Sequence, residues 1–398
     1  MKRNSILVLT PRFPYPVVGG DRLRIYRICK ELSKYYNIDL LSLCDSQEEL
    51  DFDVHDDVFN NIYRVYHSKA KSYLNVMGSL LSRTPLQIAY YKSKEFETKL
   101  NQLIDKYDMT LSHLIRVGNY TYNRKGIHVL EMTDAISLNY SRIKKSAPKN
   151  SLKSIIYSIE QKRLLEYEKS VYGKYSLISL ISKVDKEFLF GDAIKDVVIC
   201  NNGVDLNDYP YKHRDVKTTD IINLVFIGNL CSFQNFDGVK WFVNNILPEV
   251  NAQANGKKYI LNVLGKISEG DKEYLQKKEN VIVSGAVKNM AEAASSGHIG
   301  ICPVRFGAGV QNKILEYMAL GLPTITSRMG LEGIDAAVGS EILIADDSNE
   351  YIDSLKKLTQ ADVYESISQN ARVFVSEKFS WPCRLSGLVK NVEELLAK

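Results

Sequence analysis

Short apolar runs alternate with amphipathic helical stretches along nearly the whole chain. Strands that alternate with helices in this way form parallel sheets whose faces the helices cover. The pattern therefore predicts an α/β fold with two doubly wound sheets, one in each half of the chain. The expected strands lie at residues 5–10, 38–43, 61–66, 109–114, 127–132, 175–182 and 196–200 in the first half, and at 223–228, 259–265, 280–285, 298–304, 323–327 and 341–345 in the second.

Both halves open on a strand, a glycine loop and a helix, in ILVLTPRFPYPVVGGDRLRIY and in LVFIGNLCSFQNFDGVKWF. Doubly wound sheets bind ligands beyond the carboxyl ends of their strands, so two in tandem predict Rossmann-like domains that face each other across a cleft. The polar stretch 211–220 lacks apolar periodicity and indicates a linker. We expect a first domain at residues 1–205, completed by a C-terminal helix at 380–398, and a second domain at 206–379.

Composition and charge exclude several classes of protein. The net charge of +5 is too small to indicate a nucleic-acid partner, and no RNP, zinc-finger or helix-turn-helix signature accompanies it. The six cysteines show no Cys-x-x-Cys spacing, so we expect reduced thiols and a cytoplasmic protein. Pro11 and Arg12 interrupt the first apolar run, so we expect no signal peptide. No uncharged apolar stretch approaches the roughly 20 residues that span a bilayer.

A glycine loop and a helix follow the expected strand 298–304. Gly307 and Gly309 let the backbone turn tightly and lie close to a ligand. The helix expected from about Val310 leaves its first N–H groups unpaired, and such groups favour a phosphate.

Lys313 and Glu316 share one face of this helix, three residues apart. Glu316 is either a surface carboxylate paired with Lys313 or an acceptor of hydrogen bonds from ribose hydroxyls. The residues alone leave both interpretations open.

The stretch GAGVQNKILEYMALGLPTITS resembles the C-terminal signature of glycosyltransferase family four, retaining enzymes of GT-B fold. The likeness continues in PRFPYPVVGGDRLRIYRICKEL, EMTDAISLNY, NNGVDLNDY and FIGNLCSFQNFDGVKWF, and is strongest to bacterial sugar transferases of surface polysaccharide assembly, as in lipopolysaccharide or capsule. The resemblance implies a nucleotide-diphosphate sugar, linked to UDP or GDP, as donor substrate, with no permanent cofactor. It implies that Glu316 holds the donor's ribose.

The donor site is expected to draw on loops from both halves. Gly19 and Gly20 precede a helix expected from Asp21 and are either a phosphate loop or an ordinary tight turn. The loop at 285–288 is expected to meet the base through its backbone. The expected donor-binding residues are Gly19, Gly20, Gly228, Asn229, Val287, Lys288, Arg305, Gly307, Gly309, Val310, Lys313 and Glu316.

Two departures from the family pattern affect the donor site. Ala308 stands where family members usually carry the first glutamate of a Glu-x7-Glu pair, which leaves the donor sugar undefined. A lysine often found early in the second domain is absent around Asn235, so Lys313 and Arg305 are the candidates to neutralise the diphosphate. The chain has no Asp-x-Asp pair and no spaced histidine cluster, so we expect a metal-independent enzyme.

The first half contributes three candidate catalytic residues, His113, Arg116 and Asp134. His113 ends an expected strand, where parallel sheets meet their ligands, although a single histidine can also be structural. Family members commonly carry a sugar-contacting histidine near this place. Asp134 is either a general base for the acceptor hydroxyl or a helix N-cap.

Residues 68–94 contain five Lys or Arg and no acidic residue, and the stretch 142–174 is also basic. Such runs are either solvated faces or docking surfaces for an anionic membrane.

We therefore expect a glycosyltransferase that moves a sugar to a hydroxyl of a glycan or lipid-linked glycan, with retention implied by the family. Such a site positions the reactants and stabilises the departing diphosphate. The alternatives are a nucleotide-sugar epimerase of the same architecture and a non-catalytic sugar-nucleotide binder, which Ala308 makes conceivable.

Overall fold

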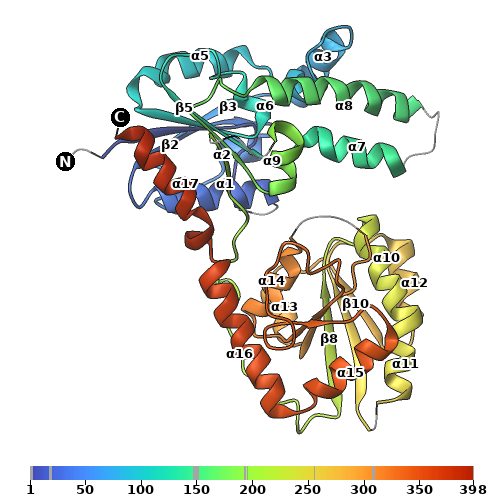
Figure 1. Ribbon diagram of the computed structural model, residues 1–398. Helices are drawn as coiled ribbons and strands as arrows, with labels where there is room; N and C mark the ends of the chain where they lie inside the picture. The colour runs from blue at the N-terminus through green and yellow to red at the C-terminus, as the bar shows by residue number, and fades with distance from the viewer. Residues whose placement is uncertain are drawn as a thin grey trace. The chain divides into compact units, whose positions relative to one another are not determined.

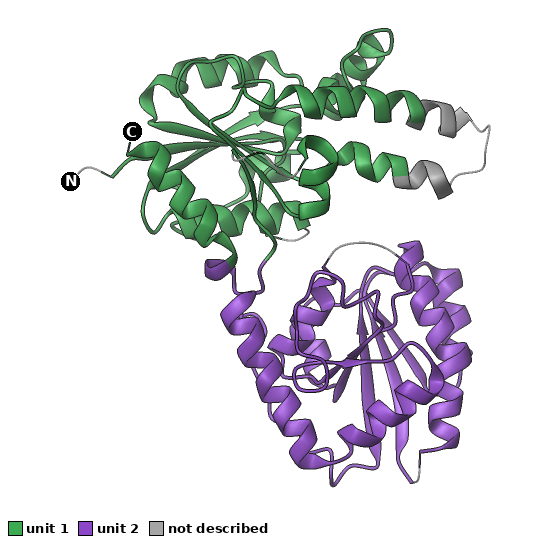
Figure 2. Ribbon diagram, in the orientation of Figure 1, with its two compact units in different colours: residues 1–202, 384–398 green, residues 203–383 purple. Residues whose placement is uncertain are grey.

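The computed structural model describes residues 3–17, 20–146, 152–191, 194, 196–254, 256–306 and 310–397, with side chains at all of these except 142–157. The chain divides into two compact units (Figure 2). Unit 1 comprises Met1–Asn202 and Arg384–Lys398, and unit 2 comprises Gly203–Cys383. The chain therefore passes from one unit to the other twice.

The stretch 211–220 lies within unit 2 and is not the boundary, so the expected linker position is wrong. Arg214 is buried there and donates hydrogen bonds to the carbonyl oxygens of Gly297, at 2.6 Å, and Leu320, at 2.9 Å. The segment is polar because its side chains form hydrogen bonds with the rest of unit 2, and such a segment has the same composition as a linker.

Unit 1 is built on a parallel seven-stranded sheet with the order β3-β2-β1-β4-β5-β6-β7 (Figure 1). The order changes direction between β1 and β4, where β1 pairs with both β2 and β4. The carboxyl ends of these two strands are therefore the expected place for a ligand. The strands are β1 (Ser5–Thr10), β2 (Asn37–Cys44), β3 (Asn61–Tyr66), β4 (Met109–His113), β5 (Ile127–Thr133), β6 (Leu177–Leu180) and β7 (Val197–Ile199).

Helices bury the apolar faces of this sheet. Leu7 and Leu9 of β1 pack in one cluster with Phe96 and Leu100 of α5 (Lys94–Leu103). The other helices are α1 (Gly20–Leu32), α2 (Gln47–Asp51), α3 (Lys69–Ser79), α4 (Leu86–Tyr90), α6 (Ile115–Gly118), α7 (Ile136–Ser146), α8 (Leu152–Ser170), α9 (Lys183–Phe190) and α17 (Trp381–Leu396), with a 3₁₀ turn at Ile104–Lys106.

Unit 2 has a parallel six-stranded sheet with the order β10-β9-β8-β11-β12-β13, and its order changes direction between β8 and β11. Leu224 and Phe226 of β8 join one buried cluster, whereas Val225 and Ile227 join another. A strand buried on both faces gives an unbroken apolar run, which is why this strand is readable in the sequence. The strands are β8 (Ile221–Ile227), β9 (Lys258–Leu264), β10 (Val281–Gly285), β11 (Ile299–Cys302), β12 (Thr324–Thr326) and β13 (Leu343–Ile344).

The helices of unit 2 cover both faces of its sheet (Figure 1). They are α10 (Phe233–Trp241), α11 (Leu247–Ala252), α12 (Glu269–Gln276), α13 (Met290–Ser295), α14 (Asn312–Ala319), α15 (Ser348–Leu358) and α16 (Ala361–Lys378), with a π-helical segment at Phe242–Ile246.

The predicted fold class, two doubly wound α/β units, is confirmed, and every expected strand is present. Most strand ends differ from the expected ones by one or two residues; β11, for example, stops at Cys302 and not at Val304. None of the helices in the described part of the chain combines the length and the apolar character that a membrane span needs.

Candidate functional site

Gly228 and Asn229 follow β8 at the point where the strand order of unit 2 changes direction. The ends of β8 and β9 lie backbone against backbone there, since a methyl group at Gly265 would come within 1.9 Å of the Gly228 carbonyl oxygen. The side-chain nitrogen of Asn235, on α10, donates to the Asn229 carbonyl at 2.9 Å. The loop after β8 is thus tied to the first turn of α10.

Lys313, in the first turn of α14, lies at the same edge of the sheet. Its side chain is buried, and Nζ donates to Asn235 Oδ1 at 2.9 Å and to Gln311 Oε1 at 3.1 Å. The ammonium also lies 5.2 Å from the centre of the Phe226 ring. Both hydrogen-bond partners are neutral amides, so the positive charge is held in place without being neutralised by them and can attract an anion.

Arg305 follows β11 and leans over α10. Its guanidinium donates two hydrogen bonds to Asp237, from Nε to Oδ2 and from Nη2 to Oδ1, both at 3.0 Å. It lies 5.6 Å from the ring centre of Trp241 and 5.3 Å from that of Phe306. The structure therefore brings Arg305 and Lys313 to α10 through Asp237 and Asn235.

Glu316 is one turn further along α14. Burial raises the pKa of its carboxyl, while a hydrogen bond from Tyr209 and the charge of Lys313 act in the opposite direction. The surface ion pair with Lys313, one of the two interpretations above, receives no support, because the Lys313 ammonium bonds to Asn235 and Gln311.

The start of α14 differs from expectation. The helix begins at Asn312 and not near Val310, because Gln311 has an extended backbone with φ of −82° and ψ of 96°. In unit 1, Gly20 is the first residue of α1, one position before the expected Asp21. Gly19, Gly307, Ala308 and Gly309 lie outside the described residues.

Val287 and Lys288 follow β10 at the carboxyl edge of the sheet of unit 2, with Lys288 exposed. Gly285 closes the strand with a φ of +72°, a left-handed conformation that favours glycine. In the sheet, β10 is separated from β8 by β9. These residues therefore share the edge with Gly228 but lie two strands away from it.

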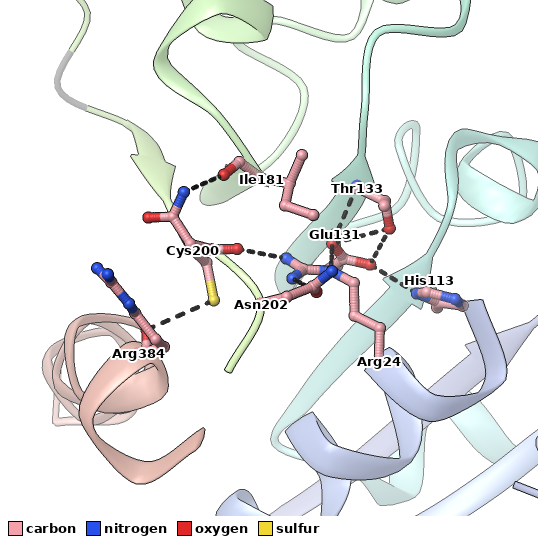
Figure 3. Close-up of polar contacts among 9 residues, drawn as sticks. Arg24, His113, Glu131, Thr133, Ile181, Cys200, Asn202 and Arg384 are labelled. Atoms are coloured by element: carbon pink, nitrogen blue, oxygen red, sulfur yellow. Dashed lines mark hydrogen bonds and ion pairs between the residues drawn. The ribbon is translucent and has the colours of Figure 1, made fainter. Parts of the chain in front are cut away.

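Unit 1 holds a buried polar network where β4 and β5 end (Figure 3). Arg24 of α1 donates from Nε to Glu131 Oε1 at 2.8 Å, and His113 Nδ1 lies 2.6 Å from Glu131 Oε2. Arg24 also donates to Asn202 Oδ1 at 2.9 Å and to the Cys200 carbonyl at 2.8 Å. The side chains of Arg24, His113 and Glu131 are at most 3% exposed, so the ion pair is removed from water.

Glu131 is ionised in this network. Burial opposes ionisation, but the charge of Arg24 and the hydrogen bond from His113 outweigh burial and lower the pKa of Glu131 to about 2. An ionised carboxylate only accepts hydrogen bonds, so Nδ1 of His113 carries the proton. The ring is thereby fixed, and its buried Nε2 has no hydrogen-bond partner among the described residues.

Two residues beside this network have left-handed backbones although neither is glycine. Leu114 follows His113 with a φ of 64°, and Thr133 ends β5 with a φ of 66°. The Leu114 amide donates to the Glu131 carbonyl at 2.6 Å, and the Thr133 amide donates to Glu131 Oε1 at 2.9 Å. Strained backbones of this kind persist where the surrounding structure requires them, which is common at functional sites.

Arg116 and Asp134 lie near the network but are not part of it. Arg116 donates to Gln87 Oε1 at 3.0 Å, and its guanidinium lies 5.7 Å from the Tyr91 ring centre. Asp134 accepts a hydrogen bond from Asn139 at 2.6 Å, and burial, followed by the charge of Asp185, raises its pKa.

The alternative in which Asp134 caps the following helix is wrong. The amide of Ile136, the first residue of α7, donates to Glu168 Oε1 at 2.7 Å, and the amide of Ala135 donates to Asp185 Oδ1 at 3.1 Å. Carboxylates from α8 and α9 therefore take the capping role.

The sequence did not predict several of these polar residues, among them Arg24, Glu131, Asn235 and Asp237. Glu131 carried a usable signal, because it is a single charge inside the apolar strand IHVLEMT. A charge at such a position requires a buried partner. Within the described ranges, no three His, Cys, Asp or Glu side chains lie close enough to hold a metal ion.

Comparison with known proteins gives a family match, a relative of similar length and solved structures of the same fold. Residues 222–361 match the family described as Glycosyl transferases group 1. A Klebsiella pneumoniae protein described as an uncharacterised 44.6 kDa protein in the cps region is 24% identical over 409 residues, covering 97% of this chain and 99% of the relative.

Several solved structures cover the chain over almost its full length. The sucrose-phosphate synthase of Thermosynechococcus elongatus superposes with a TM-score of 0.68 at 14% identity, over 99% of this chain and 100% of that one. HepE of Anabaena in complex with UDP superposes with a TM-score of 0.61 at 15% identity, over the same shares of both chains. At these identities the likeness shows the fold. Residues 222–361 therefore match the glycosyl transferases group 1 family, and the chain has the GT-B fold that its sequence motifs predicted.

Proposed function

We propose that this protein is a glycosyltransferase that moves a sugar from a nucleotide-diphosphate sugar to a hydroxyl of a glycan or lipid-linked glycan, with retention. We further propose that it works in surface polysaccharide assembly, on the cytoplasmic side of the membrane. The family match over residues 222–361 supports sugar transfer, and the relative from a cps region supports the polysaccharide role. HepE, which has the same fold, holds UDP, and this supports a nucleotide-linked donor.

The observation that carries the proposal is the buried ammonium of Lys313 at the switch point of unit 2, whose hydrogen-bond partners are the neutral amides of Asn235 and Gln311. Lys313 and Arg305 are each fixed by a side chain of α10, Asn235 and Asp237 respectively. Fixed cations need no reorganisation when a diphosphate departs, so they stabilise the transition state more than mobile ones do. In this proposal Lys313 and Arg305 bind the diphosphate and Glu316 accepts hydrogen bonds from the ribose. Gly228, Asn229 and Val310 line the donor, and the backbone at Val287 and Lys288 meets the base.

Unit 1 supplies the acceptor side in this proposal. His113 presents Nε2 to the transferred sugar, and Glu131 and Arg24 position its ring. Asp134, whose pKa burial raises, orients or deprotonates the acceptor hydroxyl, with Arg116 nearby. The reaction as proposed needs neither a protein nucleophile nor a metal ion.

The test begins with acceptor-dependent nucleotide release, measured for a panel of UDP- and GDP-sugars chosen by thermal stabilisation of the protein. A transferase releases nucleotide only when an acceptor is added, and EDTA leaves the rate unchanged. An epimerase would interconvert two sugar nucleotides without acceptor, and a pure binder would do neither. Either of those outcomes contradicts the proposal.

Lys313→Met gives the sharpest variant, because methionine keeps the buried stem and removes the charge. We expect turnover to fall by about 10²–10³-fold, the range for removing one group that stabilises developing negative charge. The melting temperature should change little. Lys356→Met, at an exposed lysine of α15, is the matched control and should retain full activity. Unchanged activity of Lys313→Met with an unchanged melting curve would refute the role of Lys313.

A further inference from the structure

Helix α3 has its polar and apolar sides reversed relative to an ordinary surface helix. Ser72 and Ser79 are buried, with 1% and 7% exposure. The large apolar side chains face solvent instead, and we call them the α3 stripe. Its members are Tyr73, Leu74, Met77, Leu80 and Leu81, which are 62%, 66%, 66%, 52% and 102% exposed.

Tyr73, Leu74 and Met77 of the helix and Leu80 at its C-cap fall at i, i+1, i+4 and i+7, the period of a helix, and Leu81 follows in the turn after α3. This spacing normally places an apolar face against the core. Here the same face is left outside, and contiguous exposed apolar side chains mark a surface that meets a partner or a membrane. Figure 1 shows α3 projecting from the sheet and the neighbouring helices of unit 1.

Polar contacts hold α3 in this orientation, together with a ring contact between Tyr73 and Tyr90 of α4, whose centres lie 5.8 Å apart. The Asn75 side chain donates to the Lys92 carbonyl at 2.8 Å, and Arg163 of α8 donates to the Leu80 carbonyl at 2.7 Å. Ser68 caps the helix by accepting from the Lys71 amide at 3.3 Å. The stripe is therefore displayed by a fixed element of unit 1 and is not a frayed end.

The charges around the stripe favour an anionic partner. Residues 68–94 contain Lys69, Lys71, Arg83, Lys92 and Lys94 and no acidic residue, and all five cations are exposed. Lys69 and Lys71 also form ion pairs with Asp45 and Glu95, but these pairs are solvent-exposed and so hold their cations weakly.

A lipid surface fits this combination better than a protein does. Protein interfaces are depleted in lysine, whereas four of the five cations here are lysines. Helices that lie in a membrane interface place aliphatic and aromatic side chains in the acyl boundary and lysines toward the headgroups. In the second basic stretch, 142–174, the side chains at 142–157 lie outside the described residues.

We infer that the α3 stripe inserts into the surface of an anionic phospholipid membrane, with Lys69, Lys71, Arg83, Lys92 and Lys94 facing the headgroups. On this surface the proposed enzyme would meet a lipid-linked acceptor. That link to the acceptor rests on the proposed function, whereas membrane insertion rests on the exposed side chains and charges.

The test is sedimentation of the full chain with vesicles of phosphatidylcholine, with and without phosphatidylglycerol, at low and high salt. We expect binding to the phosphatidylglycerol vesicles that weakens as salt rises. The triple variant Leu74→Ser, Met77→Ser, Leu81→Ser should bind at least about tenfold more weakly, because it removes insertion while leaving the cations. The matched control is Val184→Ser, Val338→Ser, Val373→Ser, which changes side chains that are 45%, 57% and 53% exposed elsewhere. It should bind like the wild type.

The inference is overturned if the wild type does not bind phosphatidylglycerol vesicles, or if the triple variant binds as well as the wild type. It is also overturned if light scattering shows a dimer that the triple variant converts to a monomer, since the stripe would then join two copies. Nucleotide release with a water-soluble acceptor should be the same in the triple variant and the wild type. Loss of transfer by a protein that still binds vesicles would contradict the proposed function alone.

Discussion

At the scale of the residue, the most constrained group in unit 1 is Glu131. It accepts from Arg24, from the Thr133 amide and from His113, and it is completely buried. Buried ion pairs add little net stability, because desolvation offsets the attraction. Removing one partner of such a pair is nevertheless strongly destabilising, because it leaves the other charge buried without compensation. The ion pair with Arg24 therefore holds Glu131 in place, and Glu131 in turn fixes the His113 ring through Nδ1.

We therefore expect Glu131→Gln to lower the free energy of unfolding of unit 1 by about 3–5 kcal/mol, the usual effect of breaking a buried pair. Urea unfolding followed by circular dichroism measures the change. Glu187→Gln breaks an exposed pair with Lys183 in the same unit, where the carboxylate side chain is 42% exposed, and it serves as control. The control should stay within about 0.5 kcal/mol of the wild type. Equal effects of the two substitutions would show that Arg24 does not depend on Glu131.

At the scale of the element, α10 determines where the side chains of Lys313 and Arg305 lie. Their partners, Asn235 and Asp237, are both on this helix. The backbone of α10 approaches the segment after β11 closely at Gly238. A methyl group at this position would lie 2.6 Å from the Pro303 carbonyl oxygen. Pro303 directly follows β11, so this contact fixes the distance between α10 and the strand that leads to Arg305.

Gly238→Ala should therefore destabilise unit 2 by about 1–3 kcal/mol, because the added methyl group overpacks a contact with backbone that cannot rotate away. Gly270→Ala is the matched control, since it lies in helix α12 with nothing within 4 Å of the added group. That change should stabilise the protein by about 0.5–1 kcal/mol, as expected for glycine in a helix. Thermal unfolding of both variants measures the contrast, and a stabilised Gly238→Ala protein would rule out the close approach.

The contact between the start of α7 and the end of α8 predicts how stability depends on pH. Glu168 of α8 accepts from the amides of Ile136 and Ser137, and burial, only partly offset by these hydrogen bonds, raises its pKa from 4.5 to about 7. The folded state therefore binds a proton more readily than the unfolded state between these values. The contribution of Glu168 to stability falls as pH rises from about 4.5 through 7.

Glu168→Gln removes this titration. The melting temperature of the wild type relative to Glu168→Gln should accordingly be higher at pH 5 than at pH 8. A difference between the two proteins that does not change with pH, or one that changes in the opposite direction, would show that Glu168 is ionised throughout.

At the scale of the whole molecule, the chain crosses between its units at Asn202–Gly203 and again within α17, at Cys383–Arg384 (Figure 2). The end of α17 belongs to unit 1 and buries Leu385, Leu388 and Val392 there. Unit 1 is thus completed by residues that follow all of unit 2.

A chain ending at Cys383 should lose stability in unit 1 alone, on the order of 5 kcal/mol for three buried apolar side chains. Both tryptophans, Trp241 and Trp381, lie in unit 2, so in a Trp381→Phe background Trp241 fluorescence reports only that unit. Circular dichroism of the truncated chain should show an early transition that Trp241 fluorescence lacks. Two probes shifting together would mean that the units unfold as one.

The sequence by itself determined the class of fold and the positions of the strands, because strands covered on both faces carry unbroken apolar runs, as residues 224–227 of β8 do. It also determined that His113 ends a strand and that Lys313 and Glu316 lie on one helix, since these are local relations. It could not determine which polar groups meet. Arg24 and Glu131 are 107 positions apart, and Asn235 and Lys313 are 78 apart.

Those meetings depend on the strand order, in which β1 pairs with β4 across two intervening strands of the sequence, and on the close approach of α10 to β11. The tertiary structure also decided which side of α3 faces outward. Its apolar spacing is that of an ordinary buried face, and contacts with other elements, such as the hydrogen bonds of Asn75 and Arg163, turn that face to solvent. A pattern along one element shows which side chains share a face, but contacts between distant elements determine where that face points.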